Sequence, residues 1–141
     1  MSKSNSLENA LLLLIFNATG IADIADNDQT SPATTLTVAL HTSDPGEAGN
    51  QSTDEASYTG YARVTVARTA GGWTVSGNSV SPAANIDFPV CTASPGGAIT
   101  HFSVGTGVGN VMLYSGTVTP NITMAVGVIP RINTTSTITE D

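Results

Sequence analysis

Apolar and polar residues alternate in two runs in the first half of the chain. In the run 36–41 (LTVALH), the first, third and fifth residues are large and apolar, so an extended strand would carry Leu36, Val38 and Leu40 on one face. The run 61–67 (YARVTVA) repeats this rhythm. Each run therefore predicts a strand with one buried face.

A polar, acidic loop separates these two strands. It spans residues 42–57 (TSDPGEAGNQSTDEAS) and contains the tripeptide Asp44-Pro45-Gly46. Proline presets φ, the Asp side chain accepts a backbone N–H, and glycine tolerates positive φ, so this tripeptide predicts a tight turn.

The rest of the chain is a succession of short apolar runs punctuated by Gly, Pro and Asn. Gly77-Asn78 is a two-residue hairpin signal between two of these runs. The predicted strands after residue 67 are 72–75, 78–81, 85–88, 99–105, 110–115, 122–126, 128–132 and 134–139. About eight to ten short strands without intervening helices predict an all-β fold, a jelly-roll-like β-sandwich or a barrel.

The one helical pattern lies at the N-terminus, where leucines recur at helical spacing. Asn5 followed by Glu8 resembles a capping box, and Thr19-Gly20 supplies an end, so we predict a helix over about residues 6–17. Its apolar residues lie on more than one side, which favours equally a plug for the sandwich and a helix at an interface. The predicted organisation is a helix and lead-in segment over 1–34 and a β-sandwich domain over 35–141.

Charge limits the classes of partner. The chain of 141 residues has a net charge of −7 and only four basic residues, so a cationic surface for phosphates is not expected and neither is direct nucleic-acid binding. Charged residues make up 11% of the chain, a low share that suits a protein packed against neighbours. The single Cys91 excludes an internal disulfide.

No apolar run approaches the ~20 residues needed to span a bilayer, so no membrane partner is expected. The nearest candidate, 10–16, is short, follows Glu8 and precedes no convincing cleavage site, so we interpret it as part of the helix.

A search for reactive groups yields no site. His41, Asp44, Asp87 and His101 could be imagined around a metal, but their spacing forms no compact ligand motif. Cys91 has no catalytic signature around it. The glycine-rich run 105–109 lacks the lysine and the helix of a phosphate loop and predicts a hairpin connection. We therefore expect no enzyme, no cofactor and no metal.

The order of the segments carries more information than any single residue. The succession LHTSDPGEAG, YTGYARV, GGWTVSG, SPAANIDFPV, ITHFSVGTG, LYSGTVTP and VGVIPR resembles a family of small tailed-bacteriophage virion proteins. The resemblance covers about residues 36–131. Members are similar to capsid decoration (cement) proteins or to tail-fibre-like components.

The resemblance implies a structural role without catalytic residues. The main interpretation is a cement protein, made in the host cytoplasm, that sits on the outer surface of the capsid as a dimer or trimer. It would contact the major capsid protein and stabilise the shell against DNA pressure, and linked contacts raise the effective concentration of later ones. The alternative is a tail or tail-fibre component that binds a receptor. The candidate interface residues are Leu11, Leu14, Phe16, Asp44, Glu47, Asp54, Glu55 and Tyr58.

Overall fold

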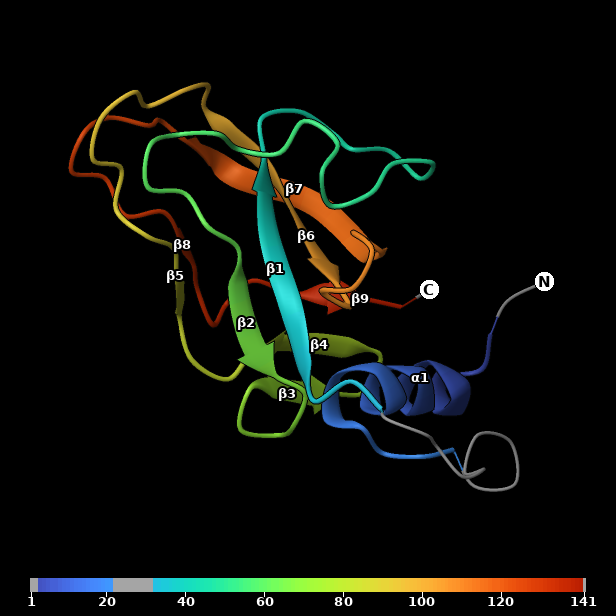
Figure 1. The fold of residues 1–141 in the computed structure, drawn as a ribbon. Coiled ribbons are helices and arrows are strands. Elements are labelled where there is room, and N and C mark those ends of the chain that lie inside the picture. Colours follow the sequence, from blue (N-terminus) through green and yellow to red (C-terminus); the bar gives the residue numbers. More distant parts are fainter. Residues whose placement is uncertain (1–2, 22–31, 141) are drawn as a thin grey trace. The chain divides into compact units, whose positions relative to one another are not determined.

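The structure is a computed structural model that describes residues 3–21 and 32–140. These residues form one helix and nine short strands (Figure 1). The elements are α1 (Asn5–Asn17), β1 (Thr35–His41), β2 (Val64–Ala67), β3 (Trp73–Ser76), β4 (Ser79–Pro82), β5 (Ile86–Asp87), β6 (Ile99–Gly105), β7 (Met112–Ile122), β8 (Arg131–Ile132) and β9 (Ile138–Thr139).

The strands form open sheets rather than a closed barrel. One sheet has the order β2-β1-β6-β7, a second has the order β3-β4-β9, and β5 pairs with β8. The β1–β6, β6–β7, β3–β4 and β4–β9 pairs are antiparallel. The predicted class, a sandwich-like all-β protein with one N-terminal helix, is confirmed.

The chain divides into two compact units. One contains the described parts of 1–35, 67–85 and 132–141, and the other contains 36–66 and 86–131. The predicted division at residue 34 stays a prediction.

In the first unit, α1 packs on the β3–β4 hairpin. The buried rings of Phe16 and Trp73 meet edge to face, with centroids 4.9 Å apart. The Asn9 side chain donates to the Gly77 carbonyl at 2.6 Å. Arg68, just beyond β2, donates from its guanidinium to the carbonyls of residues 14 and 15 at the end of the helix. A cation at this end compensates the unpaired carbonyls and the negative pole of the helix.

The ends of α1 differ from the prediction. The N-cap is Ser4, whose Oγ accepts from the Leu7 N–H at 3.3 Å, and Asn5 is already the first helical residue. At the other end the left-handed residue is Ala18, with φ 54°, rather than Gly20. The Thr19 N–H then donates to the Leu13 carbonyl at 3.1 Å, which closes the last turn.

The predicted Gly77-Asn78 hairpin is confirmed. Ser76 pairs with Ser79 across a two-residue turn in which Gly77 has φ +61°. Positive φ at the first central position is what glycine permits without steric cost.

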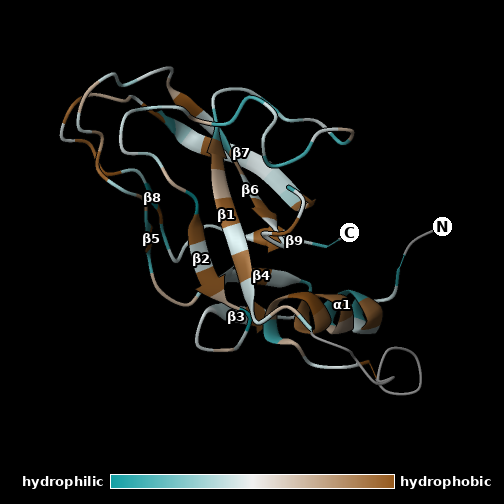
Figure 2. Cartoon of the chain, viewed as in Figure 1, coloured by the Kyte–Doolittle hydropathy of each residue, from teal (hydrophilic) through white to brown (hydrophobic). Residues whose placement is uncertain are grey.

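In the second unit, β1 corrects one expectation. We predicted one buried face, but every residue from Leu36 to His41 is buried. Its apolar face belongs to the core, where buried Val38 lies opposite buried Val104 of β6. The polar face is covered by the loop that follows β1, which is largely hydrophilic (Figure 2).

The long strand β7 corrects a second expectation. Separate strands were predicted at 110–115 and 122–126, but a single strand runs from Met112 to Ile122 and no strand covers 123–126. Two irregularities in its pairing with β6 absorb the change of register. Gly116 lies within the strand opposite Phe102, whose ring comes within 3.4 Å of the position that a Cβ would occupy.

Candidate functional site: the polar cluster beneath loop 42–57

The loop after β1 is held by a series of turns. The Asp44 carboxylate accepts from the Gly46 N–H at 2.9 Å, and Gly46 has φ +68°, so the predicted turn is confirmed. A second turn follows, in which the Asn50 side chain accepts from the Ser52 N–H at 2.8 Å. The returning segment pairs with β1 through a bridge between Glu55 and His41. The loop is thus an ordered cover over β1.

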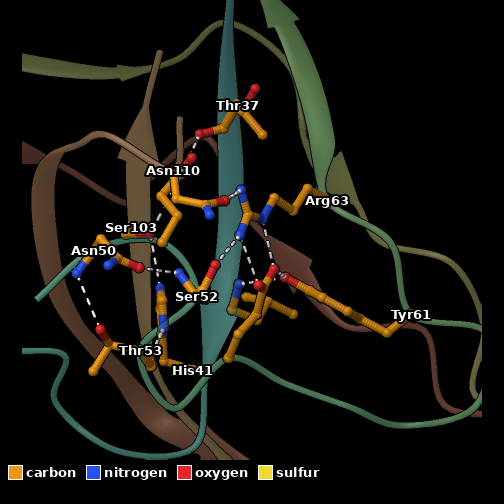
Figure 3. Close-up of polar contacts among 12 residues, drawn as sticks. Thr37, His41, Asn50, Ser52, Thr53, Tyr61, Arg63, Ser103 and Asn110 are labelled. Carbon is orange, nitrogen blue, oxygen red and sulfur yellow. Dashed lines mark hydrogen bonds and ion pairs between the residues drawn. The ribbon is translucent and has the colours of Figure 1, made fainter. Parts of the chain in front are cut away.

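Four polar side chains are buried between this loop and the sheet: Thr37, His41, Gln51 and Ser103. His41 Nδ1 donates to the Thr53 carbonyl at 2.8 Å, which leaves Nε2 to accept from Ser103 Oγ, also at 2.8 Å (Figure 3). Gln51 Nε2 donates to the Thr37 carbonyl at 2.8 Å. Each bond joins the loop to the sheet or one sheet strand to the next.

Gln51 is a loop residue whose side chain is buried against the sheet. Its side chain is fully buried, and its Oε1 has no hydrogen-bond partner among the described residues. The side chain lies against Gly105, where an added Cβ would come within 2.5 Å of Gln51 and 2.2 Å of the Val111 carbonyl. Glycine at this position is therefore required by the packing of the loop.

An ion pair that is largely buried lies beside this cluster. Arg63 Nε and Nη2 donate to the two oxygens of Glu55, each at 2.7 Å. The same guanidinium donates to Asn110 Oδ1 at 2.9 Å and to Ser52 Oγ at 3.2 Å (Figure 3). Tyr61 donates to Glu55 at 2.8 Å. Arg63 thus binds the loop through a bidentate pair with Glu55 and binds the β6–β7 connection through Asn110.

Burial sets the protonation state of this region. It lowers the pKa of His41, an effect stronger than the opposite influence of the Thr53 carbonyl and the Glu55 carboxylate. Burial also raises the pKa of Glu55, but the hydrogen bonds and charge of Arg63, with the Tyr61 hydrogen bond, outweigh it and hold that pKa below its ordinary value. Burial is the main cause that raises the pKa of Tyr61. Near neutral pH the cluster therefore holds a neutral imidazole beside a charged carboxylate.

The predicted interface residues of α1 fall into two groups. Leu11 and Leu14 are half-buried, whereas Phe16 is fully buried against Trp73. In this conformation Phe16 contributes to the core and presents no side chain to a partner.

The predicted residues of the loop also separate by exposure. Asp44, Glu47 and Asp54 are exposed, and Asp54 accepts from Ser43 Oγ at 2.6 Å. Glu55 is engaged with Arg63. Tyr58 is buried, its hydroxyl donates to the Pro89 carbonyl at 2.8 Å, and burial raises its pKa to about 12. Among the predicted interface residues of the loop, the exposed carboxylates are the ones that a partner can contact in this conformation.

Sequence reasoning missed the buried polar cluster. Gln51 and Ser103 give no signal in the sequence, because single polar residues in a loop and in a strand have no characteristic spacing. The hint that existed was the polar face of the first strand, with Thr37 and His41 four residues apart.

The arrangement has limited chemical scope. A serine within hydrogen-bond distance of a histidine is the geometry of an activated nucleophile. Here, however, Ser103 and His41 are both 0% exposed. Among the described residues no group of three His, Cys, Asp or Glu side chains gathers as a metal site would require. None of the described helices has the length and apolar character that a membrane crossing requires. The glycine-rich run 105–109 begins at the last residue of β6 and forms most of the connection 106–111 to the antiparallel β7, so the predicted hairpin connection is confirmed.

Comparison with known proteins gives the family. No curated protein matches the chain. A family model described as podophage GP4 fiber I protein gp80 matches residues 2–139, nearly the whole chain. This match confirms the resemblance to tailed-phage virion proteins and extends it to the N-terminal helix. The chain belongs to the podophage GP4 fiber I protein gp80 family.

Proposed function

We propose that this protein is a structural component of a fibre on the virion of a tailed phage. The observation that carries the proposal is the match of residues 2–139 to a family described as a fiber protein. It supports the tail-fibre alternative better than the capsid decoration protein that was our main interpretation from the sequence.

We further propose that the protein has no enzymatic activity. The Ser103–His41 pair joins two strands beneath an ordered loop, and both side chains are withdrawn from solvent. A nucleophile must reach its substrate, so we assign a structural role to this pair: it joins β1 to β6, and His41 also binds the loop through the Thr53 carbonyl.

The exposed carboxylates of the fixed loop are the surface that we assign to a partner. Asp44, Glu47 and Asp54 are exposed on a backbone held by its own turns and by Arg63. Fixed carboxylates favour a basic surface, on a receptor or on a neighbouring virion protein, and lose little entropy on binding. Tail-fibre attachment or receptor binding would both use such a surface.

The capsid decoration role is the second candidate. Its support is the low share of charged residues, 11%, which suits a protein with many neighbours. In that role the partners would be the major capsid protein and further copies of the chain.

Location and copy number on intact particles separate the two roles. Purified virions would be labelled with an antibody against the chain, viewed by electron microscopy, and quantified by mass spectrometry against the major capsid protein. We expect label on fibres and a few to a few tens of copies per particle. Label spread over the shell, with hundreds of copies, would reject the fibre role in favour of decoration.

A variant tests the loop surface. Virions that carry Asp44→Asn, Glu47→Gln and Asp54→Asn together should assemble the protein but adsorb to host cells more slowly or hold the fibre less firmly. The matched control is Asp87→Asn, which removes a carboxylate paired with Arg131 outside the loop. Unchanged adsorption and unchanged fibre retention in the triple variant would reject the loop as a contact surface.

A further inference from the structure

Charge is distributed unevenly along the chain. From Phe88 to Pro130 the sequence contains no Asp, Glu, Lys or Arg, although the whole chain carries a net charge of −7. This segment belongs to the second compact unit and includes β6, β7 and the connections around them. A long stretch without charge on a soluble protein is unusual, because surfaces are normally rich in charged residues.

The same segment carries most of the exposed apolar side chains. Seven large hydrophobic side chains are exposed in the described parts of the chain, and all but Leu7 lie in this segment. The six are Val90, Val108, Val111, Leu113, Val126 and Ile129. Depletion of charge together with exposed apolar groups is the compositional signature of the core of a protein interface.

β7 gives this segment a specific means of pairing. It is the last strand of the four-stranded sheet and is 11 residues long, whereas β2 at the opposite edge has four. Long edge strands are normally protected by charged side chains. The sequence of β7, MLYSGTVTPNI, contains no charged side chain. Residues 114–117 pair with β6 without a break, and Ser115 and Thr117 are exposed along them, whereas Leu113 and 118–121, which include Pro120, lie at two irregularities of the pairing. This edge therefore lacks the charge that would keep another strand away.

The charges elsewhere indicate which partner can use this edge. Each of the four basic residues is already engaged within the chain: Lys3 with Glu140, Arg63 with Glu55, Arg131 with Asp87, and Arg68 with the end of α1. Two copies of a chain with a net charge of −7 repel one another, and this repulsion opposes contact least where charge is absent. A basic partner would instead be drawn to the acidic loop.

We propose that two copies of this chain pair through β7, antiparallel and about a two-fold axis, to continue the sheet from one protomer into the next. Such a contact is isologous, so the strand has to complement only itself. If the two-fold axis passes beside a residue of β7, each exposed residue of one copy's β7 lies opposite an exposed residue of the other copy's β7. The hydroxyls of Ser115 and Thr117, which lie in the part of β7 that pairs regularly with β6, then lie at or beside the axis and face the same hydroxyls of the second copy. Such pairs stabilise strand pairing.

A charge placed on β7 tests the proposal. Thr117→Lys would bring two like charges together near the axis, and Thr65→Lys, at an exposed position of β2, is the matched control on the other edge of the same sheet. We expect the wild-type chain and Thr65→Lys to be dimers in sedimentation equilibrium. Thr117→Lys should have a dimer dissociation constant at least tenfold higher, because like charges directly opposite destabilise a strand pair.

Hydrogen exchange at two protein concentrations provides a measurement that needs no variant. Amides of Met112–Ile122 should exchange more slowly when the wild-type chain is concentrated, and those of Val64–Ala67 should not change. The proposal would be overturned if the chain were a monomer at all concentrations or a trimer. It would also be overturned by a dimer that is unaffected by Thr117→Lys and shows no concentration-dependent protection of β7. None of these results depends on where the protein sits in the virion.

Discussion

Replacing Arg63 by Met tests whether the ion pair fixes the loop on the sheet. Methionine keeps an unbranched apolar stem but removes the guanidinium, which donates twice to Glu55 and once each to Ser52 and Asn110. Glu55 would keep its hydrogen bond from Tyr61 but lose its cation.

The burial of the pair sets the size of the effect. The side chains of Arg63 and Glu55 are 22% and 20% exposed. Solvent-exposed pairs contribute about 0–1 kcal/mol, and breaking a fully buried pair costs about 3–5 kcal/mol. Hydrogen bonds to charged groups contribute about 1.5–3 kcal/mol net. For a pair about four-fifths buried we expect a loss of about 2–3 kcal/mol in the free energy of unfolding.

Arg131→Met is the matched control. Arg131 also donates to both oxygens of one carboxylate, that of Asp87, but these side chains are 52% and 48% exposed. The bidentate geometry is similar, but the Arg131 pair is more exposed, and Arg63 also donates to Ser52 and Asn110. The loss of stability in Arg131→Met should therefore be much smaller than that in Arg63→Met.

Urea denaturation monitored by circular dichroism measures both variants, with stability taken from linear extrapolation. Adding Glu55→Gln completes a double-mutant cycle, in which Glu55→Gln and Arg63→Met together should cost clearly less than the sum of the two single losses. If Arg63→Met costs no more than Arg131→Met, or if the cycle is additive, the pair does not hold the loop and the reasoning is refuted.

Three further predictions concern the buried histidine, one glycine and the end of the helix. The pKa of His41 is lowered in the folded chain, so as pH falls below about 6.5 the unfolded chain binds a proton that the folded chain does not. The free energy of unfolding is therefore highest above this pH and decreases below it. The slope of unfolding free energy against pH between 7.5 and 5.5 should be shallower in His41→Gln, and an identical slope would contradict this. Gly105→Ala should destabilise by about 3 kcal/mol in urea denaturation because its Cβ meets backbone and Gln51, whereas Gly116→Ala, which meets only the Phe102 ring edge, should cost much less. Ala18→Gly should raise the free energy of unfolding by about 0.5–1 kcal/mol, because glycine adopts the left-handed conformation of residue 18 without strain. Ala10→Gly, within α1, should lower it by about 1 kcal/mol. Equal melting temperatures for the two variants would contradict the assignment of the cap.

The elements that the sequence predicted well are those with a strong local signal. The run from Ile99 to Gly105 became a strand with the predicted bounds, and the Gly77-Asn78 turn formed as expected. Both depend on alternation or on the φ preference of glycine, which act over a few residues. The predicted break within β7 failed because Gly and Pro in its sequence suggested the end of a strand. Gly116 is paired with Phe102 of β6, and at Pro120 an irregularity in the pairing lets the strand continue to Ile122.

The candidate site could be predicted only in part. The turn at Asp44 followed from local chemistry, and so did the exposed carboxylates of the loop. The burial of Gln51 and Ser103 did not, because the loop contacts a strand residue 52 positions away along the chain, in a register that no short pattern encodes. Alternation gives the polar face of a strand but not what covers it.

The second compact unit places two surfaces of different chemistry in one body, and salt should distinguish the contacts that they make. The acidic loop would bind a basic partner through charges separated by solvent, an attraction that weakens as the Debye length falls from about 10 Å at 0.1 M salt to about 3 Å at 1 M. Pairing through β7 involves no charged side chain on the strand, while the chain's charge of −7 opposes the approach of a second copy. Added salt screens that repulsion, so self-association should be maintained or strengthened under the conditions that release a basic partner. All four basic side chains are engaged within the chain. Neither the acidic loop nor β7 therefore gains attraction for its partner from a basic side chain of this protein.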